Sequence, residues 1–349
     1  MANYLDENGY LSYDKMMKLS RNFNFTIGAR GLGKTCQTKE HIEHREGHPV
    51  LYVRRFKVQA SLQCSEEGDF TKDFMYPTAI FDWNEKIGIG KVYLSESDQE
   101  KSDPALIIVS LSTFQNLTGI DLTNVYTVVF DEFIPQKGDR PLKHEFQAYK
   151  NIMEIVYRNR PFEDTEKIKV WFYGNSNAIS SNILLGYKLI ETVYKMVHKS
   201  IEYATPTDGI ALFIPLDSPV SQRKAKNAFY RNLPENRANM ELRNAFSDLD
   251  DSHVCHKNLK EYNHEILLPC FSISRAKGGE WDNFYITKPL KSKPFCTYAN
   301  TETDLEKWQT VGKKYFKSAF MRGKLSFASY EVQTMFLASF DCVSWNDLL

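Results

Sequence analysis

The 349-residue chain lacks the cysteine patterns that build disulfide frameworks or zinc sites. Its six cysteines are scattered, and no two of them form a CxxC pair. Paired cysteines are typical of structural zinc sites, and dense cysteines are typical of small disulfide-stabilised domains. His253, Cys255 and His256 lie close together, but their spacing matches no standard metal-ligand pattern. We therefore expect reduced thiols and no zinc site.

Long apolar runs and an excess of one charge are also missing. No apolar stretch approaches the roughly 20 residues that cross a bilayer. The N-terminus, MANYLDENGY, has neither an apolar core nor a basic flank. Lys plus Arg and Asp plus Glu both number 44, so no global positive charge indicates nucleic-acid binding. We expect a soluble, unexported protein of the cytoplasm, without membrane partners, in which any nucleic-acid site is local.

The composition that is present suits a globular chain with two cores. Apolar residues make up 42% and charged residues 25%, which excludes a fibrous or wholly disordered chain. Between about Phe23 and Phe213, short apolar runs alternate with helical patterns, which predicts an α/β fold with a parallel sheet flanked by helices. The expected strands cover residues 22–27, 50–56, 106–110, 125–130 and 168–173.

Weaker patterns fill the rest of the chain. Apolar spacing predicts an amphipathic helix over residues 145–160, whereas residues 62–104 have little periodicity and favour a long surface insertion. Residues 221–243 carry six basic side chains against two acidic ones, which favours a linker. Residues 266–275 and 284–287 predict a hairpin, followed by helices at about 304–321 and 330–340. The predicted division is residues 1–205, a basic linker or lid over 206–243, and a smaller domain over 244–349.

One segment satisfies the phosphate-binding pattern GxxxxGK[ST]. It consists of Gly28, Ala29, Arg30, Gly31, Leu32, Gly33, Lys34 and Thr35, between a predicted strand and a helical stretch. Glycines let backbone N–H groups face phosphate oxygens at the positive end of the following helix. We predict that this P-loop binds ATP, with Lys34 on the β- and γ-phosphates and the Thr35 hydroxyl on Mg²⁺. An ordinary glycine-rich turn is the alternative, which the flanking elements disfavour.

Two carboxylates follow the predicted strand over residues 125–130. The carboxyl ends of parallel strands gather where phosphate-binding loops lie, so Asp131 and Glu132 are expected near the P-loop. We predict that Asp131 holds the magnesium shell and that Glu132 is the general base toward water. Solvated turn residues are the alternative. The chain has no N-K-x-D element for reading guanine, which favours ATP hydrolysis coupled to mechanical work over signalling.

Polar residues after two other elements are further candidates. Asn177 follows the strand predicted over 168–173, where an amide can bond the γ-phosphate or the attacking water, although a turn residue bonding its own backbone fits equally. Arg158 and Arg160 end the helix predicted over 145–160. They either stabilise the helix C-terminus or reach a neighbouring subunit's ATP as an arginine finger, a contact worth about 10³ to 10⁵ in rate.

Taken in order, several segments resemble the DNA-packaging ATPase of phi29-like tailed bacteriophages, a small relative of terminase large subunits and FtsK/HerA-type translocases. The segments are FTIGARGLGKT, LYVRRFK, TVVFDEFI, VYRNRP and SNAIS, with a weaker extension in SAFMRGKLSF. The resemblance implies an ASCE-type P-loop fold and an ATP-driven homomeric ring, a pentamer. Such a ring docks on the portal, or connector, of a procapsid in the host cytoplasm and pumps in double-stranded DNA.

The resemblance also implies roles for single residues. Gly28 to Thr35 would be the Walker A loop, Asp131 and Glu132 the Walker B acid and catalytic glutamate, and Arg158 the trans-acting finger, with Arg160 as second candidate. Lys57 and Lys137 would stand on loops facing the pore, where cations contact DNA phosphates without reading sequence; solvated surface lysines are the alternative.

In terminase relatives the C-terminal domain has an RNase H-like fold whose acidic cluster cuts DNA with two metals, and the resemblance implies the same fold here. Residues 266–275 contain no carboxylate. We therefore expect a degenerate, nuclease-inactive domain that docks to the portal, to a scaffold RNA or to DNA.

Three other functions share parts of this pattern. A cellular-type DNA translocase or helicase would use every nucleotide-site residue, and strand separation would distinguish a helicase. A small-molecule kinase is disfavoured by the base-like Glu132 and by the lack of an obvious acceptor lid. The third is a non-catalytic assembly protein whose P-loop is a nucleotide-gated clamp.

Overall fold

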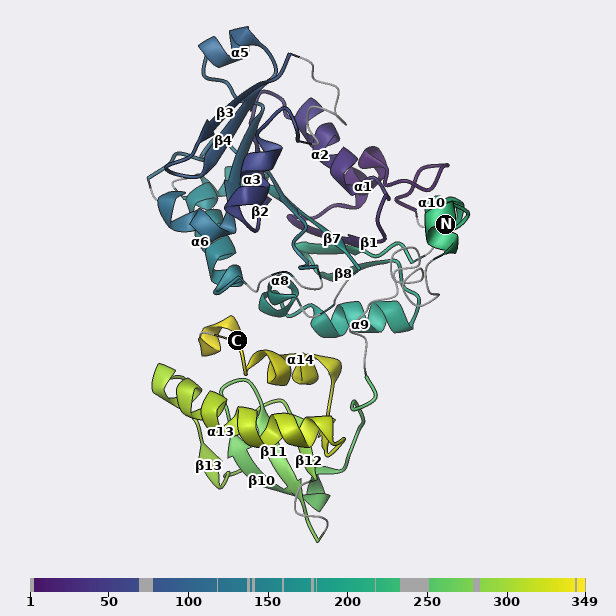
Figure 1. Cartoon of the computed structure of the whole chain (residues 1–349), viewed down its shortest axis with the longest axis vertical. Coiled ribbons are helices and arrows are strands. Elements are labelled where there is room, and N and C mark those ends of the chain that lie inside the picture. Colours follow the sequence, from purple (N-terminus) through teal and green to yellow (C-terminus); the bar gives the residue numbers. More distant parts are fainter. Residues whose placement is uncertain are drawn as a thin grey trace. The chain divides into compact units, whose positions relative to one another are not determined.

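The structure is a computed structural model in which two compact units are resolved (Figure 1). It describes residues 3–68, 78–117, 119–136, 139, 142–158, 160–176, 179, 181–216, 218–232, 251–278, 283–342 and 344–348. The first unit comprises Met1–Leu142, Gln147–Ala178 and Lys195–Ser247, and the second comprises Lys143–Phe146, Ile179–Tyr194 and Asp248–Leu349. Among the described residues, no helix has the length and apolar character needed to span a membrane.

The first unit is built on a nine-stranded sheet with the order β3-β4-β5-β2-β6-β7-β1-β9-β8. Its strands are β1 (Phe23–Gly28), β2 (Val50–Arg54), β3 (Ile80–Asn84), β4 (Ile89–Tyr93), β5 (Leu106–Ser110), β6 (Thr127–Asp131), β7 (Lys169–Asn175), β8 (Tyr203–Thr207) and β9 (Ile210–Phe213). All five predicted strands are present, as β1, β2, β5, β6 and β7. They and β9 pair in parallel. The sheet is nevertheless mixed, because β3, β4 and β8 add antiparallel pairs at its two edges.

The described helices flank these strands and those of the second unit. They are α1 (Tyr13–Leu19), α2 (Lys34–Glu43), α3 (Lys57–Gln63), α5 (Glu96–Glu100), α6 (Glu145–Tyr157), α7 (Phe162–Thr165), α8 (Asn182–Gly186), α9 (Ile190–His198), α10 (Pro219–Ala225), α11 (Ala228–Arg231), α13 (Glu302–Met321) and α14 (Tyr330–Ala338). The helix predicted over residues 145–160 is α6, and it ends before Pro161, which cannot continue a helix.

The predicted surface insertion over residues 62–104 is instead part of the sheet. It contains β3, β4 and α5, and β4 pairs with β5. The strand pattern is weak because β3 lies at an edge and is half exposed, while Gly90 interrupts β4. A Cβ at Gly90 would lie 2.6 Å from the Cys64 Sγ, so the close approach of Cys64 requires glycine there. The predicted linker over 206–243 likewise begins inside the sheet, since β9 pairs with β1.

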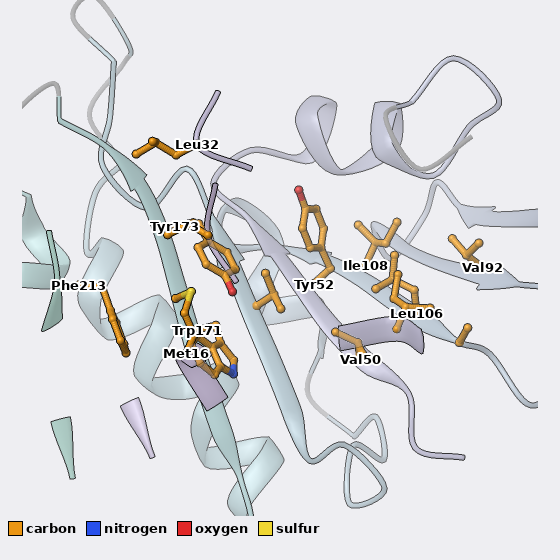
Figure 2. Packing of buried hydrophobic residues seen from close by; sticks show 14 of the residues in the cluster. Met16, Leu32, Val50, Tyr52, Val92, Leu106, Ile108, Trp171, Tyr173 and Phe213 are labelled. Carbon is orange, nitrogen blue, oxygen red and sulfur yellow. The ribbon is translucent and has the colours of Figure 1, made fainter. Parts of the chain in front are cut away.

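The core of the first unit lies around the central strands. β2 and β5 are buried at every position, as parallel strands covered on both faces should be. Trp171 and Tyr173 of β7 pack in one cluster with Leu32 and Phe213 (Figure 2). Leu32 belongs to the P-loop segment, so the loop is anchored in the core by its one large apolar side chain.

The second unit has a five-stranded mixed sheet, in the order β13-β10-β11-β12-β14, beside α13 and α14 (Figure 1). Its strands are β10 (Tyr262–Leu267), β11 (Ser272–Ala276), β12 (Phe284–Thr287), β13 (Cys296–Thr297) and β14 (Leu325–Phe327). The predicted hairpin is β11–β12. The single strand predicted over 266–275 is wrong, because a turn with Pro269 separates β10 from β11. Consequently the first strand of this sheet does carry a carboxylate, Glu265, which lies 3.4 Å from Arg275.

Candidate functional site

The P-loop segment connects β1 directly to α2. β1 ends at Gly28 and α2 begins at Lys34. Gly31 and Gly33 have φ values of 81° and 86°, in the left-handed region that glycine adopts without strain. The turn leaves the first N–H groups of α2 without helical partners, and the positive end of the helix dipole lies there too. This arrangement favours an anion at the loop.

The Lys34 side chain is folded back onto its own loop. Its Nζ donates hydrogen bonds to the carbonyl oxygens of Gly28 at 2.8 Å and Ala29 at 2.7 Å. Burial lowers the pKa of Lys34 to about 7, and the positive charges of Lys224 and Arg30 act in the same direction, while Asp131 opposes them. An anion bound at the loop would relieve this penalty on the charged form.

A cavity of about 830 Å³ lies over the loop. Its walls include Lys34, Thr35, Asp131 and Glu132. Residues that the sequence predicted from separate motifs therefore meet at one cavity, whose volume suits a nucleotide. Arg30, Gly31 and Gly33 also line it, together with Tyr10, Leu11, Cys36, Gln37, Gln136, Tyr173 and Asn175.

The two acids at the end of β6 are paired with one arginine from the neighbouring strand β2. The Arg54 Nη1 lies 2.9 Å from Asp131 Oδ2, and its Nη2 lies 2.6 Å from Glu132 Oε2. The Tyr52 hydroxyl donates a further bond of 2.7 Å to Asp131. Arg54 is buried, so these charge-assisted bonds are shielded from water. Glu132 has a φ of 55°, a costly conformation for a residue with a side chain, and such strain clusters at functional sites.

A second chain of polar contacts joins the P-loop to Glu132. The Arg30 Nη2 donates to Gln136 Oε1 at 3.0 Å, and the Gln136 Nε2 donates to Glu132 Oε1 at 3.5 Å. The loop after β6 therefore contacts both the P-loop and Glu132 through Gln136.

The two arginines after α6 have different surroundings. Arg160 is half-buried, donates to the carbonyls of Leu122 at 2.8 Å and Val125 at 2.5 Å, and lies over the Tyr126 ring at 4.7 Å. Arg158 is exposed and lines a separate small cavity with Phe114 and Glu154. Arg160 is therefore bound within its own unit, whereas Arg158 is accessible to another molecule.

Comparison with known proteins identifies the family. Residues 5–340 match the podovirus DNA encapsidation protein (Gp16) family. The chain belongs to this family. It is a DNA-packaging protein of the phi29-like kind and a homologue of DNA packaging ATPases. The DNA packaging protein of Bacillus phage phi29 is 26% identical over 347 residues, covering 95% of this chain and 97% of the relative.

Two solved structures share the fold of this encapsidation protein. The bacteriophage Phi-29 viral genome packaging motor assembly aligns with a TM-score of 0.62 and 22% identity, over 95% of this chain and 98% of the other. The Phi-28 gp11 DNA packaging motor aligns with a TM-score of 0.61 and 16% identity, over 96% and 97%. The match extends through both units.

Two predicted site residues of the encapsidation protein, Asn177 and Lys137, lie outside the described residues. Lys57 does not line the cavity over the P-loop: its Nζ donates to the Glu85 carbonyl at 2.7 Å and forms an ion pair with the Glu85 carboxylate at 2.5 Å. Asn175, two residues before Asn177, does line that cavity.

Sequence reasoning missed Arg54, Tyr52 and Gln136. A signal for Arg54 existed, because a basic residue ends a buried strand and the carboxyl ends of parallel strands meet at one edge of the sheet. The adjacency of β2 and β6 was needed to interpret that signal, and it is a property of the strand order.

Proposed function

We propose that this encapsidation protein hydrolyses ATP, with Mg²⁺, at the cavity over Gly28–Thr35. The energy would drive double-stranded DNA into a procapsid, in the host cytoplasm, through a ring of copies of this chain. The observation that carries the proposal is the single cavity that holds the glycine-rich loop, Lys34 and both acids of β6. ATP is the proposed nucleotide because the chain has no N-K-x-D element for guanine.

The donor set of this cavity fits a magnesium ion. Mg²⁺ prefers oxygen ligands and keeps several waters, and the Thr35 hydroxyl and the Asp131 carboxylate line the same cavity. These two residues would hold the ion. Mg²⁺ supplies neutralisation of phosphate charge when bound.

Glu132 is the proposed base. A water oxygen attacks the γ-phosphorus, the bond from that phosphorus to the β–γ bridging oxygen breaks, and the water proton passes to the Glu132 carboxylate. In this structure Arg54 binds Glu132 Oε2, so the water would meet the other oxygen, Oε1, in place of Gln136. Lys34 must likewise exchange the carbonyls of Gly28 and Ala29 for phosphate oxygens. ATP binding therefore competes with two sets of internal contacts.

Arg158 is the proposed trans-acting finger. Its exposure supports a role toward a neighbouring subunit, and the internal bonds of Arg160 disfavour that residue. The proposal also includes a pentameric ring, with the portal and a scaffold RNA as partners. It further includes DNA contacts by Lys57 and Lys137 and a γ-phosphate contact by Asn177.

The C-terminal domain is proposed to be RNase H-like, without nuclease activity, and to follow an ATPase domain and a basic linker. One observation supports the inactivity: Glu265 of β10 is paired with Arg275.

The test is ATP hydrolysis by purified protein, with and without duplex DNA. We expect stimulation by DNA, loss of turnover in Glu132→Gln and in Arg158→Ala, and partial recovery when the two variants are mixed, because each would complement the other across an interface. Lys150→Ala, which removes an exposed cation of the preceding helix α6, is the matched control and should behave as wild type.

Other outcomes separate the alternatives. Turnover in Arg158→Ala equal to that of wild type would exclude the finger. Separation of the DNA strands would indicate a helicase, and nucleotide binding without any turnover would indicate a clamp.

A further inference from the structure

Helix α10 lies against the N-terminal loop and is fixed there by contacts of its own. The Ser218 Oγ at its start donates to the Gly9 carbonyl at 2.7 Å and accepts the Val220 N–H. The Arg223 Nη2 donates to the Asn8 carbonyl at 2.8 Å, and its guanidinium lies over the Tyr10 ring at 5.9 Å. The position of α10 therefore does not depend on the residue that follows Arg223.

That residue, Lys224, reaches the P-loop. Its Nζ donates to the Arg30 carbonyl at 3.2 Å. A Cβ built on Gly31 would lie only 1.7 Å from the same nitrogen, so the amine occupies the space that a side chain at position 31 would need. Lys224 is thus a loop contact from a segment that carries no nucleotide-binding motif.

The contact leaves positive charge in excess at the loop. Arg30, Lys34 and Lys224 gather there, and the nearest acids, Asp131 and Glu132, are already paired with Arg54. Within the described part of the chain, Lys224 has a neutral carbonyl as its acceptor and no ion pair. A lysine so placed gains more from an anionic oxygen than from a carbonyl, because an anion adds Coulomb attraction between opposite charges.

The place of the contact indicates which phosphate is nearest. The Arg30 side chain is linked through Gln136 to Glu132, the proposed base. A base toward the attacking water must face the terminal phosphate. Lys224 contacts the carbonyl of the residue whose side chain is linked to that base, which favours the γ-phosphate as its partner.

We propose that Lys224 is a further nucleotide-binding residue, which leaves the Arg30 carbonyl for the γ-phosphate when ATP binds and so contributes to the preference for ATP over ADP. This inference rests on the proposed function.

The experiment measures dissociation constants for Mg-ADP and for a non-hydrolysable Mg-ATP analogue, by calorimetry on the full chain. In Lys224→Met we expect about a tenfold or greater loss of affinity for the ATP analogue, as for one lost charge-assisted bond, and a change within about twofold for ADP. Lys224→Arg should keep most of the preference for the ATP analogue. Lys226→Met, an exposed lysine at the end of the same helix, is the control and should match wild type.

Equal losses for both nucleotides in Lys224→Met would mean that the lysine only shapes the loop, and would overturn the inference. Unchanged affinities for both would overturn it as well. In either case the proposed function stands, because wild type binds. Wild-type protein that binds neither nucleotide would instead contradict the proposed function, and the inference with it.

Discussion

Arg54 is the residue on which the charge balance of the site depends. It is buried between Asp131 and Glu132, and it compensates both carboxylates within the protein. Buried acids without a partner are costly, so the site without Arg54 would require another cation. Arg54 therefore competes with any metal that uses Asp131.

Arg54→Met should make the protein responsive to Mg²⁺ in the absence of nucleotide. Removing one partner of a buried charge pair costs about 3–5 kcal/mol, so the variant should unfold at lower temperature in metal-free buffer. Millimolar Mg²⁺ should then raise its unfolding midpoint, because the acids that no longer pair with Arg54 bind the ion, and should leave wild type nearly unchanged. Tyr52→Phe, which removes the other donor to Asp131 but keeps Arg54, is the control. Equal Mg²⁺ shifts in all three proteins would contradict this account.

Lys34 leads to a prediction about pH. Burial lowers its pKa from the ordinary value of 10.5 to about 7, so between these values the folded chain has lost a proton that the unfolded chain retains. Below pH 7 the buried charge of Lys34 therefore lowers the free energy of unfolding by its full amount. This destabilisation becomes smaller as the pH rises toward 10.5. Phosphate oxygens would raise the pKa again. At pH 8 we expect ATP binding to take up about one proton at Lys34, measured by calorimetry in buffers of different ionisation enthalpy. Proton uptake by wild type that is as large at about pH 6, where Lys34 is already mostly protonated, would exclude this source.

At the scale of elements, local sequence patterns were sufficient to predict the central strands and the loop between β1 and α2. Glycine spacing, a buried strand and a following helix are properties of consecutive residues, and so is the acid pair after β6. Partners far apart in the chain were not predictable. Arg30 and Lys224 are separated by 194 positions, and Arg54 and Glu132 by 78.

Strand order and edge strands were likewise not readable from periodicity. β3 is half exposed and β4 contains a glycine that close packing requires, so neither has the signal of a buried strand. In the second sheet the apolar runs of β10 and β11 merged into one predicted strand, although Pro269 stands at their junction. Proline inside an apparent strand was the available signal.

The end of α6 allows a direct contrast between Arg160 and Arg158. Arg160→Met removes bonds to the Leu122 and Val125 carbonyls and should lower the free energy of unfolding by about 1–2 kcal/mol. ATP turnover per folded subunit should be preserved. Arg158→Ala should do the opposite, since its side chain is exposed. Urea unfolding and turnover assays on both variants measure these two effects. If Arg160→Met loses turnover but keeps the stability of wild type, Arg160 and not Arg158 is the candidate for the finger.

At the scale of the whole molecule, each of the two units encloses a core of its own. In the second unit Trp308 is buried against Phe271, Phe336 and Phe340, and its indole Nε1 donates to the Ser339 Oγ at 2.9 Å. The core of the first unit surrounds the central strands and includes Leu32 of the P-loop. The proposed nucleotide cavity is lined by residues of the first unit alone.

We therefore expect calorimetry to resolve two unfolding transitions, of which Mg-ATP moves one. A ligand at a hundred times its dissociation constant stabilises the state that binds it by about 2.7 kcal/mol, so the transition of the first unit should shift to higher temperature. The second transition should stay in place. Ser339→Ala, which leaves the buried Trp308 N–H without its acceptor, should lower that second transition and spare the first. Lys34→Met should abolish the shift caused by Mg-ATP. Each of the two transitions should still belong to the same unit as in wild type. A single transition that nucleotide moves as a whole would instead mean that the two units unfold together, and that nucleotide binding stabilises the entire chain.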